Sequence, residues 1–455
     1  MTKETGSMKR ENFGSKFGVL AAAAGSAIGL GNIWRFPYIA GKNGGAAFIF
    51  VYIIFVIVMG TPLMISELVL GRHTRSNSVG AYKVLRPNSK WKYTGILAVV
   101  TSFIILSFYS IIAGWVFTYL QQSFTGKLIK VVPDQLESYF VSLSSNASSA
   151  LFWNAIVIGL TVFIVISGIK NGIEKYSKVL MPILFFTLVA LMIRSLTLDG
   201  AKEGLKFLFK SDFSQLTTKS LLEALGHAFY SLSLGMGIII TYGSYINREE
   251  NLVSLSLQII TADTLMALMS GMVIFPAVFA YGFEPQSGPS LIFITLPAVF
   301  QAMPLGAVFE TLFFLLVGIA SITSTISLLE VSVSFVTEEF KINRKKATAL
   351  LALGVFILSI PSTLSFGVWS EVQLFGKNIF DFMDFMASYA FLTIGGCLTC
   401  IFVGWVWGSQ NAFQELTNDG AHPMKGYKIY NFIIKFIAPI AIGLIFLYST
   451  GIIKL

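Results

Sequence analysis

The feature that most constrains this chain is a series of long apolar runs, each able to cross a lipid bilayer. A membrane-spanning helix needs roughly 20 predominantly apolar residues, and hydrophobic residues make up 55% of the 455 residues while charged residues make up 12%. We therefore predict one all-α integral membrane domain over residues 1–455 with eleven transmembrane helices. The predicted spans are 16–38, 45–71, 94–121, 151–168, 177–196, 221–246, 254–281, 306–337, 347–363, 381–408 and 430–451.

Basic residues predict the orientation of these spans. They cluster at the N-terminus (Lys3, Lys9, Arg10, Lys16), after the second span and after the eighth span. Short loops rich in Lys and Arg stay on the cytoplasmic side, so we expect the N-terminus inside, the C-terminus outside, and a multi-pass protein of the plasma membrane. The net charge of +9 is accounted for by these loops, and no nucleic-acid partner is expected. The proline-rich stretch 282–305, which contains Pro285, Pro289, Pro297 and Pro304, predicts an outer loop with short helices.

Two of the spans carry helix-disrupting residues in their interior. The first contains "GSAIGLGNIWRFP" (25–37), and the sixth contains "HAFYSLSLGMGIIITY" (227–242), where Gly235 and Gly237 flank Met236. An offset of five spans gives the two segments opposite orientations, as an inverted repeat of 16–196 and 221–408 with an extra helix at 430–451 requires. Paired interruptions of this kind indicate the midplane site of a secondary transporter. Gly25 and Gly29 alone would also suit simple close packing of helices.

Each broken helix frees backbone groups that can bind ions. The N–H groups that start a second half-helix suit a carboxylate, and the C=O groups that end a first half-helix suit a hard cation such as Na⁺. Glu67, in "SELVLGR", is expected to hold the freed amides of the first broken span. Asp263 lies in the middle of the seventh span, where a carboxylate is costly and indicates function.

The segments "GSAIGLGNIWRFPY", "NGGAAFIFVYIIF", "GTPLMISELVLGR", "SFYSIIAGW", "AFYSLSLGMG", "TSTISLLEVSVSF" and "DFMDF" resemble the neurotransmitter:sodium symporter family over spans 1 to 10. The chain is most similar to the bacterial branch that carries multiple hydrophobic amino acids. The resemblance implies a five-plus-five inverted-repeat fold with helices 1 and 6 broken. It also implies Na⁺-coupled import of hydrophobic aliphatic and aromatic L-amino acids by alternating access.

The same resemblance implies a substrate site. Monoamine carriers of the family have an aspartate where this chain has Gly29, so the substrate should bring its own carboxylate. The residues implied at this site are Ser26, Ala27, Leu30, Gly31, Tyr109, Phe229, Tyr230, Ser231, Ser233, Met236 and Leu328. Leu30, Gly31 and Tyr109 would meet the carboxylate, and Ala27, Phe229 and Ser233 the ammonium.

Two Na⁺ sites are also implied by the resemblance. Their protein ligands would be Ala27, Asn32, Ser231 and Asp263 for the first, and Gly25, Ile28, Ala320, Thr323 and Ser324 for the second. All are oxygen ligands, as a hard cation prefers. Asp263 would replace the chloride ion of chloride-dependent relatives, so no chloride requirement is expected.

Two gates complete the expected machinery. Arg35 is expected to pair with Asp384 on the outside, with Asp381 as a competing partner, under a lid of Tyr109 and Tyr230. On the inside, Arg10 is expected to pair with Glu338 beneath Phe13 and Tyr245.

A channel and an intramembrane enzyme are the rival classes. Broken helices also build channel filters, but the short symmetric filter repeats of a channel are missing from the sequence. The three histidines (His73, His227, His422) are scattered, and no nucleophile–base pair is apparent, so we expect a transporter and not an enzyme.

Overall fold

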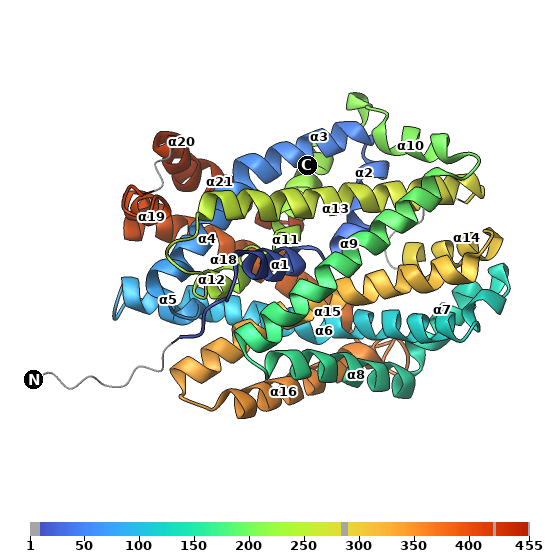
Figure 1. Ribbon diagram of the computed structural model, residues 1–455, viewed down its shortest axis with the longest axis horizontal. Coiled ribbons are helices and arrows are strands. Elements are labelled where there is room, and N and C mark those ends of the chain that lie inside the picture. The colour runs from blue at the N-terminus through green and yellow to red at the C-terminus, as the bar shows by residue number, and fades with distance from the viewer. Residues whose placement is uncertain (1–9, 284–289, 422–424, 454–455) are drawn as a thin grey trace, which may run out of the picture.

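The computed structural model describes residues 10–283, 290–421 and 425–453, and these are almost entirely helical. Lys3, Lys9, Pro285, Pro289 and His422 lie outside the described residues. Long helices run side by side along the longest axis of the molecule, and α1, α11 and α12 lie among them at its centre (Figure 1). An all-α integral membrane fold is thus confirmed.

The helices that follow the predicted spans are, in chain order, α1 (Lys16–Ala27), η1 (Gly31–Arg35) and α2 (Phe36–Lys42); α3 (Ala46–Phe55), η2 (Val56–Gly60) and α4 (Thr61–Thr74); α6 (Lys92–Phe124); α8 (Ala147–Val165); η5 (Ile169–Glu174) and α9 (Lys175–Leu196); α11 (Thr218–Ser231) and α12 (Ile238–Gly243); α13 (Leu252–Ala280); α15 (Gly306–Glu339); α16 (Arg344–Leu364); α17 (Ile379–Asp384), η8 (Phe385–Phe391), α18 (Leu392–Ile401), η9 (Phe402–Gly408) and α19 (Ser409–Leu416); and α20 (Tyr427–Phe432), η10 (Ile433–Ile437) and α21 (Ala438–Ser449). The connecting elements are α5 (Ser78–Leu85), η3 (Leu128–Lys130), η4 (Pro133–Gln135), α7 (Leu136–Ser145), α10 (Ala201–Phe209), η6 (Phe213–Gln215), η7 (Leu291–Thr295), α14 (Leu296–Ala302) and the antiparallel hairpin β1 (Gln373–Leu374) and β2 (Lys377–Asn378), in which Gln373 faces Asn378.

Within the described ranges, nine helices are long and apolar enough to cross a membrane, and the pair formed by α1 and Gly31–Lys42 makes a tenth. The two halves of that pair meet at an angle of 57°. The predicted sixth span is occupied by α11 and α12, which are separated by six non-helical residues (232–237). The total of eleven spans and the inverted repeat stay predictions. The short helices η7 and α14 lie where the outer loop was expected to carry them.

The fifth span begins earlier than predicted, at Ile169 instead of residue 177. Charged residues at positions 170, 174 and 175 interrupt the apolar pattern of this stretch. In the structure Glu174 is buried because it accepts hydrogen bonds from the Gly14 amide (2.5 Å) and the Ser15 hydroxyl (2.8 Å), and it pairs with Lys178 (2.5 Å). The charge is therefore compensated by the segment that precedes α1.

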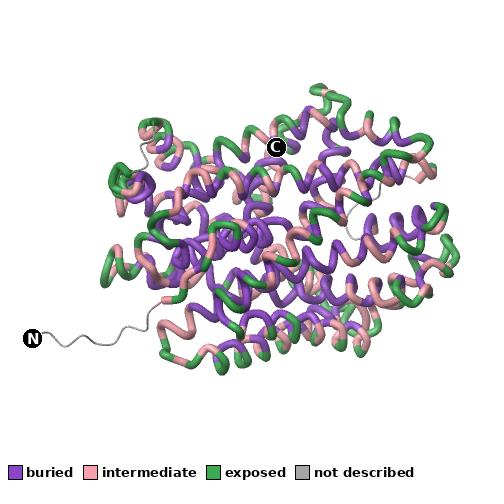
Figure 2. The backbone as a smooth tube through the Cα atoms, viewed as in Figure 1, coloured by how far each residue is buried: buried purple, intermediate pink, exposed green. Residues whose placement is uncertain are grey.

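Burial separates central helices from peripheral ones. The most apolar stretch of α15 is 89% buried, whereas the corresponding stretches of Ile169–Leu196 and Tyr427–Ser449 are 22% buried. Figure 2 shows the buried residues gathered around α1, α12 and the middle of α6 and α15. The peripheral helices expose large apolar side chains such as Phe186 and Ile440, which is expected where a helix faces lipid.

Glycines set the position of α12 against α4. A Cβ atom added at Gly71 would collide with the Ile240 carbonyl oxygen and lie 2.7 Å from the Ser244 amide nitrogen. A Cβ atom at Gly243 would lie 2.7 Å from the Leu68 carbonyl oxygen. Small residues let the two helix backbones approach closely, and this contact fixes the inner half of the broken sixth span.

We predict that Gly71→Ala destabilises the folded protein by about 1–3 kcal/mol, because the added methyl group overpacks a backbone contact. The matched control is Gly159→Ala, since a Cβ atom there meets nothing within 4 Å on the exposed side of α8. The melting temperature of purified protein checks this: it should fall for Gly71→Ala and hold or rise for Gly159→Ala. Equal melting temperatures for the two variants would contradict the assigned contact.

Candidate substrate and sodium sites

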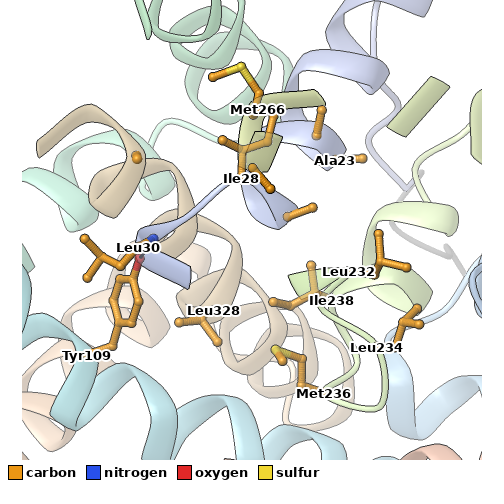
Figure 3. Close-up of a cluster of buried hydrophobic side chains, with 14 of the residues drawn as sticks. Ala23, Ile28, Leu30, Tyr109, Leu232, Leu234, Met236, Ile238, Met266 and Leu328 are labelled. Atoms are coloured by element: carbon orange, nitrogen blue, oxygen red, sulfur yellow. Dashed lines mark hydrogen bonds between the residues drawn. The ribbon is translucent and has the colours of Figure 1, made fainter. Parts of the chain in front are cut away.

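The break in the first span exposes amides that side chains then satisfy. The Gly29 N–H donates to the Asn32 side-chain oxygen at 3.0 Å, and the Leu30 N–H donates to the Tyr109 hydroxyl at 3.3 Å. In Figure 3 the Tyr109 ring reaches from α6 toward the Leu30 backbone. The start of the second half-helix is therefore a donor-rich surface beside a hydroxyl group, which suits a carboxylate.

The break in the sixth span uses unusual backbone conformations. Ser233 (φ 56°), Gly235 (φ 79°) and Gly237 (φ 77°) all adopt the left-handed region. The Gly235 N–H donates to Glu67 at 2.7 Å, and the Met236 carbonyl accepts from the Ser102 hydroxyl at 2.5 Å.

The expectation for Glu67 was wrong in its target. Glu67 holds an amide of the second broken segment, because α4 packs against α12 and places the carboxylate beneath Gly235. The first broken segment instead uses Asn32 and Tyr109 for this purpose.

The two broken segments enclose a small cavity of about 40 Å³ together with α6 and α15. Its lining includes ten of the eleven predicted substrate residues: Ser26, Ala27, Leu30, Gly31, Tyr109, Tyr230, Ser231, Ser233, Met236 and Leu328. Figure 3 shows Met236, Ile238 and Leu328 facing a common space below Leu30. The described residues thus place the predicted substrate set in one location.

Phe229 is the residue that the prediction misplaced. Its ring packs against Gly396 and Gly235. It lines a separate cavity next to α18 and not the small one. The helix α11 ends at Ser231, so Phe229 still follows the helical periodicity, and its ring packs on the Gly235 side of the break outside the small cavity.

Three lining residues were not predicted for any role or site: Ile105, Ser327 and Ile238. Helical spacing could have found two of them. Ile105 precedes Tyr109 by four residues on α6, and Ser327 follows Ser324 by three residues on α15, so each shares a face with a predicted residue. Ile238 begins the second half of the broken span, and periodicity does not carry across a break.

The first predicted Na⁺ site gathers around Asp263. The Asn32 side-chain nitrogen donates to the Asp263 carboxylate at 2.7 Å, the Ser231 hydroxyl donates to it at 2.9 Å, and Tyr52 donates at 3.4 Å. Asn32, Ser231 and Asp263 are buried. The Asn32 oxygen faces the Gly29 amide, so the amide would have to turn to offer its oxygen to a cation beside Asp263.

The second predicted Na⁺ site lies between α1 and α15. The hydroxyls of Thr323 and Ser324 donate to the Ala320 carbonyl at 3.0 and 3.2 Å. A Cβ atom at Gly25 would lie 3.4 Å from the Thr323 Cβ atom, so the two helices approach closely here. Ile28, buried at the end of α1, ends the regular backbone beside them.

The donor chemistry of both sites fits Na⁺. The side-chain ligands of the two sites are one carboxylate, one amide oxygen and three hydroxyls, and the remaining ligands are backbone carbonyls. The described residues hold no group of three or more His, Cys, Asp or Glu side chains suited to a metal. An oxygen-only set of this kind suits a hard cation.

The predicted inner gate is closed. Arg10 forms an ion pair with Glu338, and its guanidinium lies 4.6 Å from the centroid of the Tyr245 ring. Phe13 is buried edge-on against Tyr245, with ring centroids 6.1 Å apart. All four predicted residues are together. Asn77 was not predicted, and it donates to Glu338 from its amide and its side chain at 2.9 and 3.0 Å.

The predicted outer pair is not formed. Arg35 and Asp384, both in the described part of the chain, make no ion pair with each other; Arg35 donates to the Tyr389 hydroxyl at 2.9 Å, and Asp384 accepts from Ser388 at 2.6 Å. Arg35, Asp381 and Asp384 all line a cavity of about 310 Å³. This open space separates the Arg35 guanidinium from the two carboxylates.

The cavity lined by Arg35 and Asp384 shares a wall with the small cavity. Leu30, Gly31, Tyr109 and Tyr230 line both cavities. Arg35 stacks over the Tyr230 ring at 5.4 Å. Arg10 and Glu338 are thus paired on one side of the molecule, while on the Arg35 side the wall of Tyr109 and Tyr230 lies between the small cavity and a wider one.

Comparisons with known proteins agree with this geometry. The model of the Sodium:neurotransmitter symporter family matches residues 10–133 and 136–454. The uncharacterized sodium-dependent transporter YhdH of Bacillus subtilis (strain 168) is 39% identical over 446 residues, which cover 98% of this chain and 99% of that protein. An uncharacterized sodium-dependent transporter of Haemophilus influenzae is 35% identical over 456 residues, with 97% and 99% covered.

Among solved structures, the crystal structure of MhsT in complex with L-phenylalanine is similar with a TM-score of 0.89 and 43% identity. The match covers 97% of this chain and 100% of MhsT. The family match spans nearly the whole described chain and all of the residues gathered above. The chain belongs to the sodium:neurotransmitter symporter family and is a sodium-dependent symporter, not an enzyme.

Proposed function

We propose that this protein imports hydrophobic L-amino acids, aliphatic and aromatic, together with two Na⁺ ions. The observation that carries this proposal is the surface made by the Leu30 amide and the Tyr109 hydroxyl, 3.3 Å apart beside the buried cavity. Both groups can donate to a carboxylate, and the start of the second half-helix adds a partial positive charge. L-phenylalanine bound to the similar protein MhsT supports the substrate class.

Gly29 supports an amino acid over a simple amine. A Cβ atom at Gly29 would lie 2.9 Å from the Ser324 hydroxyl oxygen and 3.2 Å from the Tyr109 hydroxyl oxygen. A side chain at this position would therefore occupy the space where the substrate and an ion are proposed to meet. Without a protein carboxylate at position 29, the substrate carboxylate adds a second negative charge beside the Na⁺ ion that Asp263 is proposed to hold.

The opposite end of the cavity suits the ammonium and an apolar side chain. Ala27 ends α1, and the Ser233 hydroxyl lies 3.2 Å from the Ser26 carbonyl, so acceptors gather there. Ile105, Met236, Ile238 and Leu328 line the rest. Charged side chains are disfavoured because this lining has no partner for them. Met236 is the flexible side chain that would move to admit larger substrates.

The proposed cycle begins from the arrangement described here. Na⁺ bound at Ala27, Asn32, Ser231 and Asp263 would complete its shell with the substrate carboxylate, and a second Na⁺ at Gly25, Ile28, Ala320, Thr323 and Ser324 would tie α1 to α15. Closing Arg35 onto Asp384 over Tyr109 and Tyr230, followed by opening of Arg10 from Glu338, would transfer the site to the other side.

The proposed orientation has the N-terminus in the cytoplasm and the C-terminus outside the plasma membrane. The Arg10–Glu338 ion pair would then be the cytoplasmic gate. Arg75 donates to Asn12, two residues after Arg10, and Lys83 pairs with Glu339, the neighbour of Glu338, so these basic residues lie on the Arg10 side, as the rule for basic loops requires.

Sodium coupling is tested by uptake of labelled L-phenylalanine into proteoliposomes. Uptake should collapse when external Na⁺ is replaced by K⁺, because the first cation site shares the substrate carboxylate and the second is proposed to tie α1 to α15. Asn32→Ala and Thr323→Ala should each shift half-maximal Na⁺ to higher concentration, whereas Thr125→Ala, at an exposed helix end, should not. Undiminished uptake in K⁺ would contradict the proposal.

Specificity is tested by competition. Leucine, phenylalanine, tyrosine and other uncharged bulky α-amino acids should compete with one another for uptake, since they share the carboxylate and ammonium contacts. Tyramine, which lacks the carboxylate, should not displace tyrosine at equal concentration. If tyramine competes as well as tyrosine does, the role given to Leu30 and Tyr109 is wrong.

Asp263 is proposed to make transport independent of chloride. A fixed carboxylate held by Asn32, Ser231 and Tyr52 supplies the charge that balances Na⁺. Uptake by the native protein should be unchanged when chloride is replaced by gluconate. Asp263→Asn keeps the shape and removes the charge, so it should lose most uptake and regain part of it in chloride. Full activity of Asp263→Asn in gluconate would show a structural role instead.

A further inference from the structure

Glu310 is a buried acid that the proposed transport cycle does not use. It lies one turn into α15, at the end of that helix opposite Glu338. The side chain is 0% exposed, and neither carboxylate oxygen has a hydrogen-bond partner among the described residues. A buried polar group of this kind requires an explanation, because an unpartnered charge in a protein interior costs several kcal/mol.

A second unpartnered group lies beside it. The Ser123 hydroxyl, near the end of α6, is also buried without a hydrogen-bond partner among the described residues. Ser123 is the side chain of α6 close enough to Glu310 to interact with it. Two unsatisfied groups, one acid and one hydroxyl, therefore face each other across the packed interface of α6 and α15.

In the part of the chain that the structure describes, no basic side chain bonds to the Glu310 carboxylate. The titratable groups facing Glu310 are Tyr119 on α6 and Tyr139 on α7, and Tyr119 already donates to the Phe293 carbonyl at 3.0 Å. Arg194 on α9 stacks 5.7 Å from the centroid of the neighbouring Phe309 ring and forms no ion pair with Glu310. The sequences of η7 and α14 contain no titratable residue.

We propose that Glu310 and Ser123 form a proton-binding site, in which Glu310 is held as a neutral carboxylic acid that donates its O–H to the Ser123 hydroxyl oxygen. A single proton then removes the buried charge and joins the two groups by one hydrogen bond. A metal cation fits less well, since a hard cation takes about six oxygen ligands and the carboxylate and Ser123 supply three.

The site links proton concentration to the substrate site through two shared helices. Tyr109 lies on α6 with Ser123, and Thr323 and Ser324 lie on α15 with Glu310. Loss of the proton would leave a charge between these helices and favour opening of their interface to water. The folded protein should therefore be less stable at alkaline pH, where the unfolded chain ionises the same acid freely.

The test compares melting temperatures of the purified full-length protein with those of Glu310→Gln between about pH 6 and about pH 9. The amide mimics the neutral acid and cannot lose a proton. The native protein should lose at least about 3 °C more than Glu310→Gln over this range. Glu203→Gln, which alters a largely exposed acid on α10, should follow the native profile. Parallel profiles for native protein and Glu310→Gln would overturn the proposal.

Two further measurements test the role of Ser123 and the choice of a proton over a cation. Ser123→Ala removes the acceptor for the neutral acid, so it should lower the melting temperature mainly at acid pH and flatten the profile. An unchanged profile for Ser123→Ala overturns the proposal even if Glu310→Gln does not fold. Stabilisation of the native protein by Na⁺ at about pH 9 that Glu310→Gln lacks would show a cation site and overturn the assignment to a proton.

Discussion

Peptide groups that leave a helix at membrane depth must find new partners, and the rest of this structure depends on how that is done. The bilayer core offers no water, so an unpaired amide or carbonyl there costs several kcal/mol. In the first span, Asn32 and Tyr109 accept from Gly29 and Leu30. In the sixth, Glu67 accepts from Gly235, and Ser102 donates to the Met236 carbonyl. Glu67 comes from α4, and Tyr109 and Ser102 come from α6, whereas Asn32 belongs to the first broken span itself.

The same partners explain why a transport site can form where the helices break. Tyr109 and Asn32 each satisfy a freed amide, and each also borders a place proposed for the substrate or for Na⁺. A bound ligand would replace these internal hydrogen bonds with its own. The freed amides would therefore have partners both with and without ligand. The two residue pairs proposed as gates differ: the Arg10–Glu338 ion pair is formed, while Arg35 donates to Tyr389 and Asp384 accepts from Ser388.

Apolar length and the positions of glycine in the sequence predicted the spans and the two broken helices, and the resemblance to the family implied most of the cavity lining. The residues that prediction missed depend on contacts between distant segments. Glu67 reaches the second break and not the first because glycines bring α4 and α12 together. Phe229 packs against Gly235 and Gly396 outside the small cavity, because α11 continues to Ser231. Arg35 bonds to Tyr389 because a cavity separates Arg35 from Asp384. The fifth span starts early because Gly14 and Ser15 compensate Glu174, which no local pattern contains.

The central claim is that an amino-acid carboxylate and Na⁺ share the first broken helix. The most direct test measures equilibrium binding of L-phenylalanine and of Na⁺ to the purified protein, each with and without the other ligand. A shared site requires that Na⁺ raise the affinity for phenylalanine and that phenylalanine raise the affinity for Na⁺ by the same factor. We predict a factor of at least about ten, lost in Asn32→Ala. Equal phenylalanine affinity in Na⁺ and in K⁺ would contradict the account.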